Sequence, residues 1–301
     1  MSSSALSIWF DAIRPRTLPL AFVSISVGSG LAYYQQQFSW PIYLLALGTA
    51  LLLQILSNLA NDYGDALKGT DNAERIGPKR AMQQGLVTAE EMRKALGLNI
   101  ALISILGSAL LLYSLKNPHD FISFLGLGLL ATLAALFYTI GNKPYGYLGL
   151  GDFSVLIFFG WIAVLGSFYL HVGAMDWLLM LPATASGLLS VAVLNINNLR
   201  DIDNDRASNK LTMVVRIGAK NGRIYHLALL SGAFILFIMF TYLSQLSIQY
   251  WLFLLTLPLA IKQALTVYRT EKGESLRPML EDTVRFVLGT NILFIAPYFV
   301  G

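Results

Sequence analysis

Nine apolar stretches, each long enough to cross a lipid bilayer as a helix, follow one another along this chain. They cover residues 17–35, 42–60, 95–115, 120–140, 153–171, 177–197, 225–245, 249–268 and 283–300. Only 13% of the 301 residues are charged, about half of the share in soluble proteins. The sequence therefore predicts an all-α integral membrane protein, a nine-transmembrane-helix bundle in one domain over residues 1–301. A large soluble helical protein is the disfavoured alternative.

The positions of the basic residues indicate which ends of these helices face the cytoplasm. Every Lys and Arg except Lys116 lies in the amino-terminal segment, or in or beside the connections after the second, fourth, sixth and eighth stretches. Because loops rich in Lys and Arg stay in the cytoplasm, we expect these connections and the amino terminus on that side. Such basic loops account for the net charge of +4 without a nucleic-acid partner.

The amino-terminal segment does not have the pattern of a cleavable signal. Residues 1–16 carry apolar side chains such as Trp9 and Phe10, and Arg14 and Arg16 follow before the first apolar stretch. This pattern predicts an amphipathic helix that lies on the membrane surface. The chain has no cysteine, which excludes disulfides and thiolate metal sites.

Two clusters of Asn and Asp follow the second and sixth stretches, where segments 61–94 and 198–224 are expected in the cytoplasm. Their members recur every three or four residues, on one face of a helix: Asn58, Asn61, Asp62 and Asp65, then Asp71, in the first, and Asn198, Asp201 and Asp205 in the second. Carboxylates crowded at a bilayer edge repel one another unless a cation joins them. Such oxygen ligands suit Mg²⁺ carrying a phosphorylated substrate. A solvated helix cap remains the alternative for the first cluster, and a salt-bridged surface loop remains the alternative for the second.

Basic side chains near these clusters are candidates for binding a diphosphate. Lys143 stands alone in a loop rich in Gly, Pro and Tyr, which has the composition of a shaped lid or of a flexible connection. The basic candidates are Lys68, Arg75, Arg80, Lys143, Arg200 and Lys210. For each of them, a topology signal alone is the alternative explanation.

Several strings in the chain resemble the intramembrane UbiA prenyltransferase superfamily, above all its branch that prenylates 1,4-dihydroxy-2-naphthoate in bacterial menaquinone synthesis. They are Arg14–Pro19, Asn61–Asp71, Arg75–Pro78, Lys143–Asp152 and Asn195–Asp201. The similarity runs from residue 14 to about residue 285 and departs from the family in two places. Asp71 stands six residues after Asp65, where many relatives have four, and the Gly often found before the equivalent of Lys210 is missing.

The resemblance implies transfer of a polyprenyl group, expected to be octaprenyl, from polyprenyl diphosphate to 1,4-dihydroxy-2-naphthoate. Carbon dioxide and diphosphate would leave, and demethylmenaquinol would form. It also implies a central cavity that opens near the cytoplasmic face of the bacterial inner membrane, and Mg²⁺, with two ions expected. The expected metal ligands are Asn61, Asp65, Asp71, Asp201 and Asp205, with Asp65, Asp201 and Lys143 as catalytic residues. The expected substrate-binding residues are Asn58, Asp62, Lys68, Arg75, Arg80, Tyr138, Tyr145, Asn198, Arg200 and Lys210.

Other functions remain open from the residues alone. Another aromatic prenyltransferase of the same superfamily, of the 4-hydroxybenzoate or haem type, would carry similar acidic clusters. A cation-coupled transporter also clusters carboxylates, but it does so near the bilayer midplane in broken helices rather than at helix ends. A non-catalytic membrane scaffold would leave the paired clusters without a role.

Overall fold

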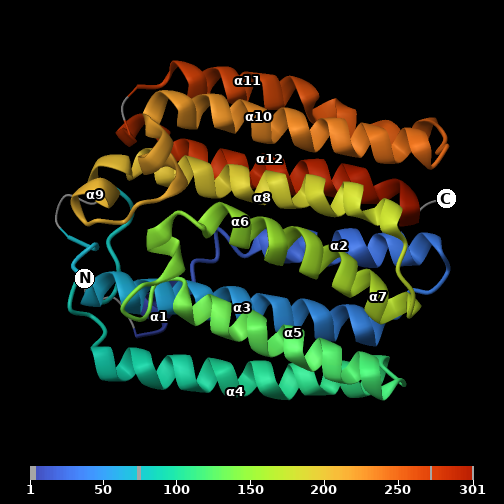
Figure 1. The fold of residues 1–301 in the computed structure, drawn as a ribbon, viewed down its shortest axis with the longest axis horizontal. Coiled ribbons are helices and arrows are strands. Elements are labelled where there is room, and N and C mark those ends of the chain that lie inside the picture. The colour runs from blue at the N-terminus through green and yellow to red at the C-terminus, as the bar shows by residue number, and fades with distance from the viewer. Residues whose placement is uncertain (1–4, 73–75, 272, 300–301) are drawn as a thin grey trace.

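The computed structural model describes residues 5–72, 76–271 and 273–299, and in these ranges the chain forms helices and no strand (Figure 1). Helices occur in every predicted stretch. The first five are α2 (Pro19–Tyr34), α3 (Trp40–Leu67), α4 (Ala89–Ser114), α5 (Pro118–Phe137) and a continuous run made of α6 (Gly151–Val155), the π-helical Leu156–Leu165 and α7 (Gly166–Val172). The others are α8 (Met180–Arg200), α10 (Met213–Leu243), α11 (Leu257–Arg269) and α12 (Arg277–Ile295).

Seven described segments are long and apolar enough to cross a membrane. They are Trp40–Leu67, Ala89–Ser114, Pro118–Phe137, Gly151–Val172, Trp177–Arg200, Met213–Leu243 and Ile248–Arg269. By contrast, α2 has only 16 residues, and α12 includes charged side chains such as Glu281 and Arg285. The all-helical class is confirmed for the described residues, and the count of nine transmembrane helices stays a prediction.

Helices α4, α10 and α12 begin well before the apolar stretches that predicted them, and α12 begins at Arg277 rather than at residue 283. Helix α4 begins at Ala89, where Thr88 and Glu91 form a reciprocal capping box. Helix α10 begins at Met213, although the apolar stretch begins at residue 225, because its first turns carry Arg and Lys on an exposed face. The backbone of α10 breaks at Gly218, whose φ of 81° is readily adopted only by glycine. The length of an apolar stretch therefore underestimates the length of a helix whose ends extend beyond the hydrocarbon core of the membrane.

Helix α8 lies in the middle of the bundle and packs against α2, α10, α12 and the π-helical stretch. Gly160 and Gly187 face each other at this contact. A Cβ atom on Gly160 would lie 2.8 Å from the carbonyl oxygen of Ala183 and 3.0 Å from the Cα of Gly187. Small residues let helix backbones approach this closely inside a membrane protein.

We therefore expect Gly160→Leu to destabilise the bundle. The side chain would push against backbone atoms that cannot move aside, and overpacking of this kind costs about 1–3 kcal/mol. Thermal unfolding in detergent should show a lower midpoint than for the natural protein. Gly126→Leu is the matched control, because a Cβ there meets no atom within 4 Å. Equal midpoints for the two variants would contradict the close contact.

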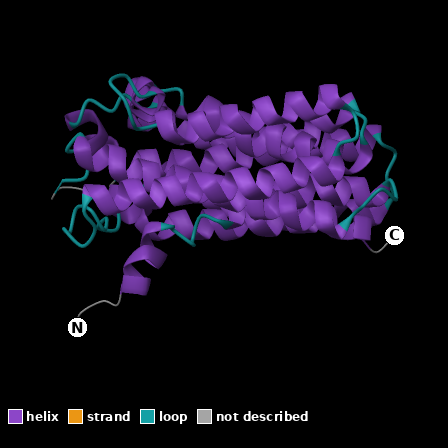
Figure 2. Ribbon diagram, turned by 90° about the horizontal axis from the view of Figure 1, so that it is seen from below, coloured by secondary structure: helices purple, strands orange, loops and turns teal. Residues whose placement is uncertain are grey.

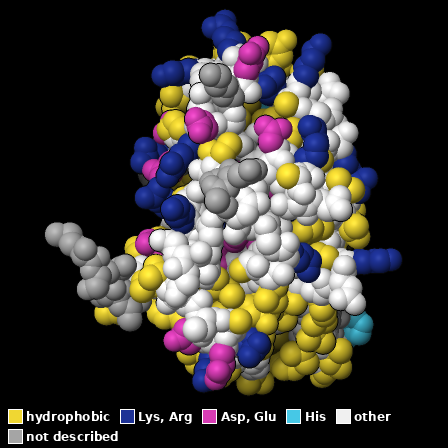
Figure 3. Space-filling view, turned by 90° about the vertical axis from the view of Figure 1, so that its left-hand side faces the viewer, with side chains coloured by type: hydrophobic (Ala, Val, Ile, Leu, Met, Phe, Trp, Pro, Cys, Tyr) yellow, Lys and Arg dark blue, Asp and Glu magenta, His cyan; other side chains and the backbone are white. Residues whose placement is uncertain are grey.

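One end of the bundle carries α1 (Ala5–Ala12), α9 (Ile202–Ala207) and the connecting residues 68–72, 76–88, 138–150 and 208–212, and we call it the polar end (Figure 1). Lys, Arg, Asp and Glu side chains gather there (Figure 3). Helix α1 projects obliquely from the bundle (Figure 2). Its Ile8 and Trp9 pack against the α3–α4 core, whereas Leu6 and Phe10 are exposed. A helix within residues 1–16 is confirmed, and its contact with a membrane surface stays a prediction.

Candidate active site

One side of α3 holds the segment that precedes α2. The Nδ2 atom of Asn58 donates a hydrogen bond to the carbonyl oxygen of Ile13 at 2.9 Å. One turn further on, the buried Asp62 forms ion pairs with Arg14 and with Arg80, whose Nη1 atom lies 3.4 Å away. Asn58 and Asp62, both predicted to bind substrate, thus fix the amino-terminal segment against the site.

The carboxylate of Asp65 points to a different side of α3 and is held by two distant segments. Tyr147 donates a hydrogen bond from its hydroxyl to Oδ1 of Asp65 at 2.7 Å, and the same hydroxyl lies 2.6 Å from Oγ1 of Thr70. The Nζ atom of Lys210 lies 3.2 Å from Oδ2 of Asp65. This ammonium group also lies 5.2 Å from the centroid of the Tyr147 ring. Asp65 is therefore the junction of α3, the loop after α5 and the loop after α9.

The second cluster begins where α8 ends. Arg200, which is almost fully buried, donates from Nε to Oδ1 of Asp201 at 2.8 Å and from Nη2 to Oδ1 of Asn197 at 2.7 Å. The backbone amide of Asp205, in α9, donates to the carbonyl oxygen of Asp201 at 2.8 Å. This i to i−4 hydrogen bond closes the first helical turn after α8, so both carboxylates lie within one turn of each other at the same end of the bundle.

Two contacts bring the acidic clusters together at the polar end. The Nδ2 atom of Asn204, in α9, donates to the carbonyl oxygen of Thr70 at 3.0 Å, in a buried position. The Lys210–Asp65 ion pair is the second contact. Asp71 and Asp205 are both buried beside these contacts, with exposed fractions of 9% and 5%. The segments after α3 and α8, far apart in sequence, thus share one buried polar region.

Internal cations accompany the carboxylates. The sequence predicts crowded carboxylates that a cation must join, and in the structure Lys and Arg side chains of the same chain supply part of that positive charge. Among the described residues, no three carboxylate or imidazole side chains stand close enough to bind a metal ion by themselves. The pairs are Asp62 with Arg14 and Arg80, Asp65 with Lys210, and Asp201 with Arg200.

Lys210 and Tyr147 keep their protons at neutral pH. Burial by itself would lower the pKa of Lys210, but the Asp65 and Asp205 carboxylates outweigh it and raise this pKa above its ordinary value. Burial and the charge of Asp65 raise the pKa of the Tyr147 hydroxyl. Asp65 therefore faces a permanent cation and a permanent hydrogen-bond donor.

The sequence analysis missed Tyr147, although it lies in the loop whose tyrosines were noted. The turn η1 (Tyr145–Leu148) directs neighbouring tyrosines apart. Tyr147 reaches Asp65, whereas the hydroxyl of Tyr145 donates to the carbonyl oxygen of Ala134 at 2.8 Å and lies 3.0 Å from Ser154. No periodic signal separates the two in a loop, so only the contacts identify Tyr147.

Tyr138 lies close to this region. Its ring meets that of Tyr145 edge-on, with centroids 5.3 Å apart. Burial and the charge of Asp152 raise the pKa of Tyr138, with smaller effects from Asp65 and Asp205. The hydroxyl thus stays protonated, and the ring is close enough to sense both acidic clusters.

Other predicted site residues have contacts of their own. Oγ1 of Thr139 lies 3.3 Å from Oδ1 of Asn61, and Asn198 is buried in α8. Lys68 donates to the carbonyl oxygen of Gly141 at 2.8 Å. The ammonium group of Lys68 also lies 5.8 Å from the centroid of the Tyr147 ring, beside the side chain that donates to Asp65.

The remaining predicted residues are Lys143 and Arg75. Lys143 is exposed in the loop after α5. Arg75 lies outside the described residues.

The oxygen donors fit Mg²⁺ that arrives with a diphosphate. This ion usually takes one or two carboxylates and completes its shell with water and substrate phosphates. Asp65, Asp71, Asp201 and Asp205 offer buried carboxylates at one end of the bundle, beside Lys and Arg side chains. A magnesium–diphosphate complex therefore suits this arrangement better than a metal ion without a phosphate ligand.

The fold and these paired acidic segments define a class of membrane protein. The profile of the UbiA prenyltransferase family matches residues 21–287, and the chain belongs to this family. The resemblance inferred from the motifs is thereby confirmed, and the chain is a multi-pass membrane protein.

Individual relatives are similar along almost the whole chain. The 1,4-dihydroxy-2-naphthoate octaprenyltransferase of Escherichia coli (strain K12) is 52% identical, over 99% of this chain and 97% of that protein. The Haemophilus influenzae protein of the same name is 46% identical, over 100% and 98%. The Mycobacterium tuberculosis protein of that name is 37% identical, over 91% of both chains.

Solved structures of low sequence identity share the fold. A UbiA homolog from Aeropyrum pernix K1 superposes with a TM-score of 0.68 at 19% identity, over 97% of both chains. A homolog from Archaeoglobus fulgidus, solved with DMAPP and Mg²⁺, gives a TM-score of 0.64 at 16% identity, over 97% of this chain and 98% of that one. These structural similarities show that the described helices of this chain have the same fold as these proteins.

Proposed function

We propose that this protein transfers an octaprenyl group from its diphosphate to 1,4-dihydroxy-2-naphthoate, giving demethylmenaquinol in menaquinone synthesis. The observation that carries the proposal is the 52% identity, over 99% of the chain, to an octaprenyltransferase with this acceptor. The contact between the two acidic clusters through Lys210 and Asp65 supports it, because a diphosphate needs cations and metal ligands together.

The same proposal includes an orientation in the bacterial inner membrane. Nine helices would span it, with the amino terminus and the polar end in the cytoplasm, where Lys and Arg are retained. The diphosphate would bind at the polar end, and the isoprenoid would extend between helices into a central cavity.

Two Mg²⁺ ions would be held by Asn61, Asp65 and Asp71 on one side, and by Asp201 and Asp205 on the other. When bound, they would neutralise the charge that grows on the leaving diphosphate. Lys210 is partly buried and protonated and would donate to diphosphate oxygens, and Tyr147 keeps Asp65 in place. These two side chains thus prepare the region for a polyanion.

The reaction needs no strong protein base. The allylic C–O bond of the prenyl diphosphate breaks, and the naphthoate carbon that bears the carboxylate forms the new C–C bond. The bond to the carboxylate then breaks, CO₂ leaves, and its electron pair restores the aromatic ring. The ring of Tyr138, near both acidic clusters, would stabilise the allylic cation by about 1–2 kcal/mol in a dry site.

A substrate comparison tests this function and its metal requirement. The intact protein in nanodiscs would receive octaprenyl diphosphate with 1,4-dihydroxy-2-naphthoate or 4-hydroxybenzoate, with Mg²⁺ or with EDTA. We expect prenylated product, and release of CO₂ from the carboxyl-labelled acceptor, only in the reaction that contains both 1,4-dihydroxy-2-naphthoate and Mg²⁺.

Each alternative predicts a different result. Prenylation of 4-hydroxybenzoate alone would refute the acceptor and leave the family unchanged. Full activity in EDTA would refute the metal requirement. Ion flux into sealed vesicles without any prenylated product would favour the transporter.

A further inference from the structure

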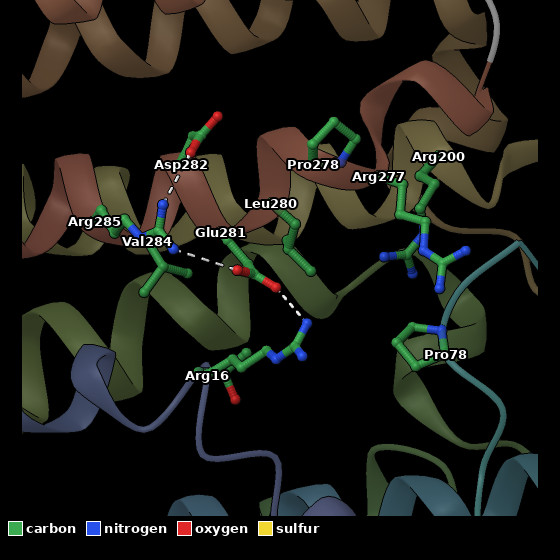
Figure 4. Close-up of a pocket in the computed structure, with 11 residues that line it drawn as sticks. Arg16, Pro78, Arg200, Arg277, Pro278, Leu280, Glu281, Asp282, Val284 and Arg285 are labelled. Atoms are coloured by element: carbon green, nitrogen blue, oxygen red, sulfur yellow. Dashed lines mark hydrogen bonds and ion pairs between the residues drawn. The ribbon is translucent and has the colours of Figure 1, made fainter.

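A pocket of about 440 Å³ lies at the polar end, beside the acidic clusters (Figure 4). Small-molecule sites usually have about 300–1,000 Å³, so its volume suits a compact ligand. Arg16 lines it from the segment before α2, and Pro78 lines it from the α3–α4 connection. Arg200 contributes from the end of α8, and Arg277 from the start of α12. Four parts of the chain that are distant in sequence therefore form its walls.

Positive charge predominates in the pocket, which four arginines and two carboxylates line. Glu281 pairs with both Arg16 and Arg285, and Arg285 also lies 3.5 Å from Asp282. Arg277 forms no ion pair with any residue that the structure describes. Its guanidinium group is therefore available to an anionic ligand, and it can bind a carboxylate through two parallel hydrogen bonds.

The remaining wall is apolar. Pro78, Pro278, Leu280 and Val284 line the pocket together with the arginines. A flat aromatic ring suits such a wall, because it can pack on apolar carbons and stack on a guanidinium plane. An inorganic anion would use only the charge. The combination indicates an aromatic acid.

Arg200 connects this pocket to the acidic clusters. Its guanidinium group contacts Asp201 and also lines the pocket. In Figure 4 the side chains of Arg200 and Arg277 extend in the same direction, toward Pro78. A ligand held by Arg277 would therefore lie beside Arg200, whose guanidinium group contacts Asp201.

We propose that this pocket receives the aromatic carboxylate acceptor before prenyl transfer and that Arg277 binds its carboxylate. The inference rests on the proposed function and adds a separate acceptor-binding subsite to it. Arginines stabilise a carboxylate and therefore oppose its loss as CO₂, so the acceptor leaves this pocket before it reacts. Binding that is lost before the transition state stabilises only the ground-state complex, so its removal raises KM and kcat together and leaves kcat/KM unchanged.

Equilibrium binding of 1-hydroxy-2-naphthoate to the intact protein in nanodiscs tests the subsite. The probe keeps the carboxylate and the ring system, and 1-naphthol, which lacks the carboxylate, is the control ligand. Arg277→Gln should raise the Kd for hydroxynaphthoate about tenfold and leave naphthol binding unchanged. Arg269→Gln, an exposed arginine of α11 outside the pocket, should stay within about twofold of the natural protein.

Kinetics give a second readout. Arg277→Gln should raise KM for 1,4-dihydroxy-2-naphthoate and kcat together, while KM for octaprenyl diphosphate remains unchanged. Equal melting temperatures would show that the variant is folded, and Arg277→Lys should recover part of the affinity because it keeps the charge.

Three results would overturn the subsite. They are an unchanged Kd for hydroxynaphthoate in Arg277→Gln, equal weakening of naphthol, and no hydroxynaphthoate binding by the natural protein. If Arg277→Gln instead lost affinity only for phosphatidylglycerol in mixed nanodiscs, the pocket would be a lipid headgroup site and the proposal would be wrong. A natural protein that binds hydroxynaphthoate through Arg277 but prenylates no naphthoate would refute the proposed function alone.

Discussion

Asp65→Asn should lower the rate of prenyl transfer about 1,000-fold, with the protein still inserted in the membrane. Asn keeps the shape of the side chain and its hydrogen bond with Tyr147, but it removes the negative charge that faces Lys210. A neutral amide is a far weaker ligand for Mg²⁺ than a carboxylate. The measurement is kcat with saturating 1,4-dihydroxy-2-naphthoate and octaprenyl diphosphate, normalised to folded protein.

The unpaired ammonium of Lys210 offers a competing explanation, because a buried charge without its partner destabilises the surrounding structure. The double variant Asp65→Asn/Lys210→Met removes both charges and separates the two effects. If loss of the carboxylate stops the reaction, the double variant melts like the natural protein and is still far slower than Lys210→Met alone, which lacks only the proposed diphosphate donor. Recovery of activity in the double variant would show that Asp65 has only a structural role.

Asp205→Asn should lower the rate about 100-fold, whereas Asp203→Asn should leave it within about twofold. Both residues belong to α9, but Asp205 is buried near Lys210 and Asp203 is exposed. The two variants therefore compare two carboxylates of one short helix, one buried in the candidate site and one exposed to solvent. The rates of both variants would be measured over a range of Mg²⁺ concentrations.

The magnesium titration is the informative part of this comparison. If Asp205 helps to hold the ion, its variant needs more Mg²⁺ for half-maximal rate, and the Asp203 variant does not. Equal losses in both variants would indicate that the net charge of α9 matters and that no specific ligand is involved.

The sequence was sufficient for the helices and for the ends where the acidic clusters lie. Apolar length and helical spacing are local properties, so α3 and α8 could be placed with Asp65 and Asp201 near their ends. The spacing was less successful within α3. Residues spaced by three or four positions spread over a broad part of the helix surface, so they need not share the same neighbours. Asn58 and Asp62 bind the amino-terminal segment, whereas Asp65 contacts Tyr147 and Lys210.

Contacts between distant segments could not be predicted in this way. Lys210 and Asp65 are 145 positions apart, and Arg16 and Glu281, which border the pocket, are 265 apart. Nothing in a single sequence states which basic loop residue neutralises which carboxylate. The acceptor pocket depends on such pairings, because Arg277 is identified only by the ion pairs that its neighbours form.

The Lys210–Asp65 pair has a consequence for the resting enzyme. A protein whose carboxylates are already neutralised from within offers little to a dissolved magnesium ion, and one whose ammonium group is occupied offers little to free pyrophosphate. Only a ligand that carries both signs of charge can exchange partners with the pair at once. Thermodynamic coupling of this kind would keep the substrate-free enzyme from binding free Mg²⁺ or free pyrophosphate tightly. The site would then remain open to the magnesium complex of the prenyl diphosphate.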